Sequence, residues 1–130
     1  ERRAFSPKAV CQDHVARRIG YRAYLKARLE LKAEQMNAWN AFEKAADDAS
    51  AKAMTRCATL PTESKDRPNV VERLTLEEDA LKARIASIEA VKPTLGALYA
   101  VLSPEQKALF DRPRGPMHER MERMRGAGPR

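Results

Sequence analysis

Apolar side chains recur every three or four residues through most of this chain, and this spacing limits the fold to helices. Between residues 33 and 57 the recurring positions are Met36, Trp39, Phe42, Ala46, Ala49, Ala53 and Cys57. Side chains three and four positions apart lie on one face of an α-helix, so such a run predicts an amphipathic helix. We therefore expect an all-α protein.

Four helices are expected, at residues 9–29, 33–57, 69–102 and 104–111. Proline and polar residues at 58–68 predict a linker, and the first two helices then form a helical hairpin. Asn69 and Glu72 fit a capping box that opens the long third helix, and Thr75 with Glu78 is a second option. Its apolar stripe consists of Leu74, Leu81, Ile85, Ile88, Leu95, Leu98 and Leu102. Pro93 lies within this stripe and predicts a kink near residues 89–93.

The composition predicts a thin core. Only 5% of the 130 residues are aromatic and 33% are charged, so the interior must be built mainly from alanine, leucine, valine and methionine. We expect a flexible lead-in at residues 1–9, one helical domain at 10–112, and a flexible basic tail containing methionines at 113–130. A thin core also leaves apolar stripes that a second subunit can cover, which predicts a dimer.

The net charge of +7, from 25 Lys+Arg against 18 Asp+Glu, raises the question of nucleic-acid binding. Basic and acidic residues are interleaved along most of the chain, however, and neither zinc-ligand spacing nor a recognition-helix signature occurs. We therefore expect no specific nucleic-acid binding. An acidic or unfolded protein, or an anionic membrane surface, fits the charge equally well.

The sequence lacks the motifs of the common enzyme classes. There is no glycine-rich phosphate loop, nucleophile elbow or His-Glu-x-x-His pattern, so we expect neither an enzyme nor a cofactor. No run approaches the roughly 18 apolar residues that cross a bilayer, and residues 1–9 lack the apolar region of a signal peptide. We expect no transmembrane segment.

One short pattern occurs twice, as Leu31-Lys32-Ala33-Glu34-Gln35 and as Leu102-Ser103-Pro104-Glu105-Gln106. The second copy predicts a helix start, because Ser103 can be the N-cap, Pro104 occupies the first helical position, and Gln106 can reach back to the cap. In the first copy Lys32 has no acceptor atom and cannot cap a helix in this way. We therefore expect a looser turn there, with no assigned role for Gln35.

The motif pair, its separation and the helical pattern between the copies resemble the LTxxQ motifs of the Spy/CpxP family over most of residues 10–112. The resemblance implies a small all-helical periplasmic protein that forms a cradle-like dimer and from which the signal peptide has already been removed. It also implies an ATP-independent chaperone that holds unfolded or partly folded proteins and is linked to envelope stress. The alternative within the family is a periplasmic regulator that senses a metal or a stress signal and binds a sensor protein.

The two cysteines, Cys11 and Cys57, are compatible with a disulfide across the open end of the hairpin. Their midpoint is Glu34, close to the expected turn, and residues equidistant from a hairpin turn face each other. An exported protein, as the family resemblance implies, would meet an oxidising compartment that favours the bridge. The alternative is a pair of reduced, buried thiols in a cytosolic protein.

The first helix carries a charged and aromatic stripe at spacings of four, three and four, formed by Arg17, Tyr21, Tyr24 and Arg28. Tyrosine rings bordered by guanidinium groups can contact both apolar and acidic residues of an unfolded chain, so this stripe is a candidate client-binding surface. Alternatively, the tyrosines pack against another helix and the arginine stems lie over them.

The tail contains four side chains with soft or imidazole ligand atoms, Met117, His118, Met121 and Met124. Such ligands suit copper(I). No complete ligand set is fixed by the sequence, so we expect no metal site and interpret the segment as a partly helical tail with a solvated charged face.

Overall fold

A computed structural model describes residues 6–63, 67–112 and 126. The described residues form four α-helices and one short 3-10 helix, and no strand. The elements are α1 (Pro7–Leu29), η1 (Ala33–Gln35), α2 (Met36–Ala58), α3 (Val70–Val101) and α4 (Pro104–Phe110). The expectation of an all-α protein is confirmed. None of these helices combines the length and the apolar character needed to cross a membrane.

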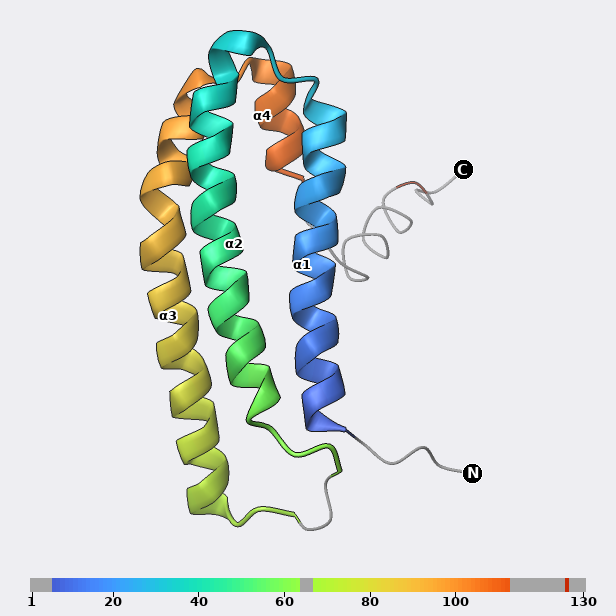
Figure 1. Cartoon of the computed structure of the whole chain (residues 1–130), viewed down its shortest axis with the longest axis vertical. Coiled ribbons are helices and arrows are strands. Elements are labelled where there is room, and N and C mark those ends of the chain that lie inside the picture. The colour runs from blue at the N-terminus through green and yellow to red at the C-terminus, as the bar shows by residue number, and fades with distance from the viewer. Residues whose placement is uncertain (1–5, 64–66, 113–125, 127–130) are drawn as a thin grey trace.

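Helix α2 is the central element of the fold. It packs against both α1 and α3, while α4 packs against α1 (Figure 1). Figure 1 shows α1, α2 and α3 running along the long axis, with α4 folded back at the end that carries η1. The predicted hairpin is therefore α1 and α2, and α3 lies on the other side of α2.

The ends of the long helices follow local sequence signals. Ser6 caps α1 by accepting a hydrogen bond from the Ala9 amide at 3.2 Å, so this helix begins two residues earlier than expected. It ends at Leu29, and the C-cap Glu30 that follows has a φ of 48°, in the left-handed region that terminates helices. Asn69 and Glu72 form the predicted capping box at the start of α3. Helix α3 then passes through Pro93 as one bowed helix (Figure 1).

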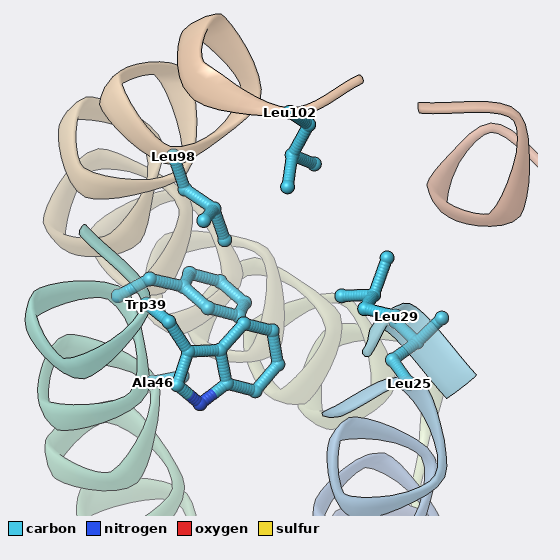
Figure 2. Packing of buried hydrophobic residues seen from close by; sticks show 7 residues of the cluster. Leu25, Leu29, Trp39, Ala46, Leu98 and Leu102 are labelled. Atoms are coloured by element: carbon cyan, nitrogen blue, oxygen red, sulfur yellow. The ribbon is translucent and has the colours of Figure 1, made fainter. Parts of the chain in front are cut away.

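The hydrophobic core is concentrated at the end where the chain turns from α1 to α2. Its buried members are Leu25, Leu29, Trp39, Phe42, Ala46, Leu98 and Leu102. Figure 2 shows Trp39 between Leu98 of α3 and the two leucines of α1. The Trp39 ring meets the Phe42 ring edge-on at a centroid distance of 5.4 Å, and Trp39 and Leu98 are fully inaccessible to solvent.

The opposite end of the molecule contains little core. Among the described residues there, only Val15 and Cys57 are buried. The structure joins Cys11 to Cys57 by a disulfide, with Cα atoms 5.5 Å apart. The bridge therefore connects the beginning of α1 to the end of α2 at the place where side-chain packing contributes least.

Reduction of this disulfide is expected to loosen one end of the protein and spare the other. The chain-entropy model assigns a bridge across 46 residues a stabilisation of about 4 kcal/mol. Because so few side chains are buried beside it, we expect amide hydrogens of residues 7–18 to exchange roughly tenfold faster, or more, after reduction. Hydrogen exchange measured by mass spectrometry tests this, with residues 39–46 as the internal control. Equal acceleration in the control segment would show that the bridge supports the whole fold.

Candidate functional site

The glutamines of the two motif copies bind each other. Gln35 and Gln106 lie 71 positions apart in the sequence, yet both are buried and their side chains meet. Gln35 Nε2 donates to Gln106 Oε1 at 2.7 Å, and Gln106 Nε2 donates to Gln35 Oε1 at 3.0 Å. The two motif copies therefore form a single structural unit.

The remaining hydrogen bonds of this glutamine pair go to helix ends. Each Nε2 also donates to a backbone carbonyl, that of Val101 for Gln35 and that of Leu29 for Gln106. Each Oε1 also accepts a backbone N–H, from Lys32 at 3.0 Å in one copy and from Ser103 at 2.9 Å in the other. Both amides thus use two donors and accept two bonds, which satisfies them fully.

The two motif copies start their helices differently. Ser103 is the N-cap of α4, and its Oγ accepts the N–H of Gln106 at 3.2 Å. The Lys32 side chain makes no capping bond, and the N–H of Gln35 instead donates to the backbone carbonyl of Lys32 at 2.9 Å in the 3-10 turn. The exchange of serine for lysine therefore changes the cap and leaves the role of Gln35 intact.

The other motif residues divide between core and surface. Leu102 is buried, and Leu31 packs partly buried against the core. Glu34, Pro104 and Glu105 are exposed. Sequence reasoning found the helix starts and missed the contact between the glutamines. The signal available was the glutamine itself, placed at the same position of both turns.

A second feature is a long depression between α1 and α3, with α2 as its floor. It consists of two cavities of about 630 and 600 Å³. Both are lined by Val15, Arg18, Ala49, Ala53, Arg84 and Ser87, so they form one continuous space that we call the trough. The side chains on its floor are short, because α2 contributes alanines there. Phe110, at the end of α4, lines the trough at the core end.

All the formally charged side chains that line the trough are cationic: Arg18, Arg22, Lys52, Arg56, Arg84 and Lys92. Among the residues that the structure describes, no aspartate or glutamate lines either cavity. Within the described residues Lys52, Arg84 and Lys92 make no ion pair, whereas Arg22 contacts Asp47 at 2.8 Å. The trough therefore has a positive potential above an apolar floor.

A smaller hollow between α1 and α2 shows the opposite charge pattern. Its volume is about 410 Å³ and its lining includes Glu43 and Asp47. Lys26 approaches Glu43 at 3.5 Å and Arg22 pairs with Asp47, so the charges there are compensated. The two hollows therefore differ in that acidic side chains line only the smaller one.

Side-chain contacts join the end of α3 to α4 and to the residue that follows it. The Tyr99 hydroxyl donates to Asp111 Oδ2 at 2.8 Å, and this hydrogen bond raises the pKa of Tyr99. Lys107 lies 5.1 Å from the centroid of the same ring, a cation–π contact. Phe110 packs against the core and makes an edge-on contact with Phe42 at a centroid distance of 6.2 Å.

The predicted stripe of α1 is divided in the structure. Tyr21 is half-buried, packs against the core and lines the trough, while its ring lies 5.8 Å from that of Tyr24. Tyr24 is 48% exposed, and Arg17 and Arg28 are also exposed, with Arg17 paired to Asp13 at 2.8 Å. Client binding by the stripe remains a prediction, and only Tyr21 joins the trough.

The tail residues considered for copper lie outside the described residues. These are Met117, His118, Met121 and Met124. In the part of the chain that the structure describes, no group of three or more His, Cys, Asp or Glu side chains is placed to hold a metal ion.

Replacing one member of the glutamine pair should destabilise the fold, because the groups bonded to that member lose a hydrogen-bond partner. Gln35→Leu or Gln106→Leu alone leaves buried polar groups without partners, at a cost of about 1–3 kcal/mol for each such group. We expect the double variant to lose less stability than the two single variants added together. Urea unfolding of all three proteins measures this. Ser103→Ala, which removes only a cap and should cost roughly 0.5–2 kcal/mol, is the comparison. Additive losses would argue against reciprocal bonding.

In a comparison with known protein families, residues 20–114 match the model of the family described as LTXXQ motif family protein. Searches of curated proteins and of solved structures gave no match. The matched range contains both motif copies and the glutamine pair, so the resemblance inferred from the motifs is confirmed. The chain belongs to the LTXXQ motif family, the Spy/CpxP type of helical protein.

Proposed function

We propose that this protein is an ATP-independent periplasmic chaperone, linked to envelope stress, that holds non-native proteins in its trough. The observation that carries the proposal is the lining of the trough, in which every formally charged side chain is cationic and the floor is apolar. Family membership supports the periplasmic location.

The lining suits an unfolded protein because such a chain exposes apolar and acidic side chains together. Transfer of the client's apolar groups from water to the alanine floor lowers the free energy. The client's carboxylates are attracted by Lys52, Arg84 and Lys92. Each contact is weak and the trough is open to solvent. A client that begins to bury its own apolar groups therefore leaves without any input of energy from a nucleotide.

The alternative function, that of a regulator, requires a different binding specificity. A regulator recognises one sensor protein and needs no affinity for unrelated unfolded chains. Light scattering of an aggregating client, in buffer without ATP, separates the two functions. Protection of several unrelated acidic clients supports the chaperone, and the absence of any protection would overturn it.

The position of the positive charge, and not its amount, should determine client holding. We expect the double variant Lys52→Glu/Arg84→Glu to lose at least half of its protection of an acidic client at low salt. The matched control is Lys44→Glu/Arg73→Glu, two exposed residues of the same helices that do not line the trough. Both variants change the net charge equally, so general attraction is the same in each. Equal protection by the two variants would remove the trough as the binding surface.

The first half of α3 supports the proposal that the chaperone is a dimer. Its exposed apolar side chains include Val71, Leu74, Leu81, Ile85 and Ile88. Leu74, Leu81 and Ile88 repeat every seven residues, and Val71 and Ile85 each lie three positions before one of them, which is the spacing of a coiled-coil seam. An exposed seam of this kind fits the same seam of a second copy.

The charge on this seam favours an antiparallel arrangement. Glu78 occupies the seven-residue position shared by Val71 and Ile85. A parallel pair in register would bring Glu78 against its own copy in a desolvated interface, at an electrostatic cost. An antiparallel pair instead sets Glu78 against a different residue of the second copy, so the two like charges do not face each other.

A charge introduced into the seam should therefore produce monomers. We expect Ile85→Asp to halve the mass found by sedimentation equilibrium while helicity stays unchanged. Leu76→Asp is the matched control, because Leu76 is 53% exposed on the same helix and lies outside the seam. A wild-type protein that is already monomeric at high micromolar concentration would contradict the dimer.

A further inference from the structure

Large apolar side chains gather at one end of the trough, and this goes beyond what holding unfolded proteins requires. Its core end is lined by large apolar side chains: Tyr21, Leu25, Phe42, Val91, Leu95 and Phe110. Toward the disulfide the lining changes to small alanines together with His14, Lys52 and Arg56. Cations line both ends, with Arg22 and Lys92 at the core end. Arg22 is paired with Asp47, whereas Lys52 and Arg56 make no ion pair among the described residues, so the disulfide end is the better place for an anion.

The length of the trough is that of a single alkyl chain. Phe42 and Arg56 are fourteen residues apart on α2, and a helical rise of 1.5 Å per residue separates them by about 21 Å. This is roughly the extended length of a sixteen-carbon chain. The two cavities, of about 630 and 600 Å³, lie in the size range of small-molecule sites.

Hydrogen-bonding requirements distinguish an alkyl chain from a polypeptide segment. The backbone groups of the helices around the trough are engaged within those helices, so they offer no partners to the amides of an inserted peptide. An alkyl chain needs none. A protein client can thus place side chains in the trough, whereas a hydrocarbon chain can occupy its whole length.

We propose that the trough binds a long-chain fatty acid, with its carboxylate beside Lys52 and Arg56 and its alkyl chain directed toward Phe42 and Phe110. The cations at the disulfide end supply the charge complementarity. Arg56 Nη1 lies 3.5 Å from the carbonyl oxygen of Asp79, and Lys52 makes no ion pair among the described residues. This inference does not depend on client holding. An occupied trough would, however, exclude clients.

Calorimetric titration of the full chain with dodecanoate, below its micelle concentration, tests the proposal. We expect one dodecanoate per chain, with octanoate and dodecyltrimethylammonium each binding at least tenfold more weakly, since the first is shorter and the second carries the opposite charge. Equal binding of the cationic amphiphile would overturn the proposal, because it would indicate non-specific uptake of detergent.

Two variants locate the site. Lys52→Glu/Arg56→Glu should weaken dodecanoate binding at least tenfold, while Lys44→Glu/Arg73→Glu should leave it unchanged. In the wild type, alanine methyl signals of Ala49, Ala53, Ala83 and Ala90 should shift on titration, as measured by NMR. Shifts scattered outside the trough would exclude this site even if the first variant failed to fold. Because binding is measured without a client, its failure is distinguishable from a failure of chaperone activity.

Discussion

The reciprocal hydrogen bonding of Gln35 and Gln106 is the contact on which the arrangement of the helices depends. Helix ends leave backbone groups unpaired, and here the end of α1, the end of α3 and the starts of η1 and α4 all direct such groups to one buried amide pair. Leu29 and Leu102, beside the pair, belong to the hydrophobic core. The position of four elements is thus fixed at one point, and the long helices extend from it.

Much of the fold could be predicted from local patterns, because helices with caps and apolar stripes are specified by neighbouring residues. Asn69, Glu72 and Ser103 carried this information, and the symmetry of the hairpin led to Cys11 and Cys57. The glutamine pair could not be predicted in this way. Its members are distant in sequence. Gln106 already had a local explanation in the helix cap, and Gln35 had no assigned role.

The trough escaped prediction for a related reason. Its basic residues come from α1, α2 and α3, and in sequence each of them is one cation among many interleaved charges. Only the placement of α1 and α3 on two sides of α2 brings them together in a lining whose formally charged side chains are all cationic. The expected stripe of α1 followed helical spacing correctly, yet spacing alone did not reveal that Tyr21 would turn toward the core while Tyr24 stayed exposed.

Stability and binding are located in different parts of this molecule. The core and the glutamine pair occupy one end, while the disulfide supports the end where packing is thin. A surface that must contact varied ligands cannot be covered by its own protein. The covalent bridge therefore allows α1 to stay alongside α2 without the buried side chains that would otherwise fill the trough.

The glutamine pair also has a consequence for how the protein meets changes in its surroundings. A side-chain amide carries no charge and neither gains nor loses a proton in ordinary acid or alkali, and its attraction to another amide is not screened by ions. Attraction to the cations of the trough, in contrast, weakens as salt rises and depends on the ionisation of whatever binds there. A change in salt concentration, or in the ionisation of a ligand, would therefore alter what the protein binds. The arrangement of the helices around the glutamine pair would stay the same.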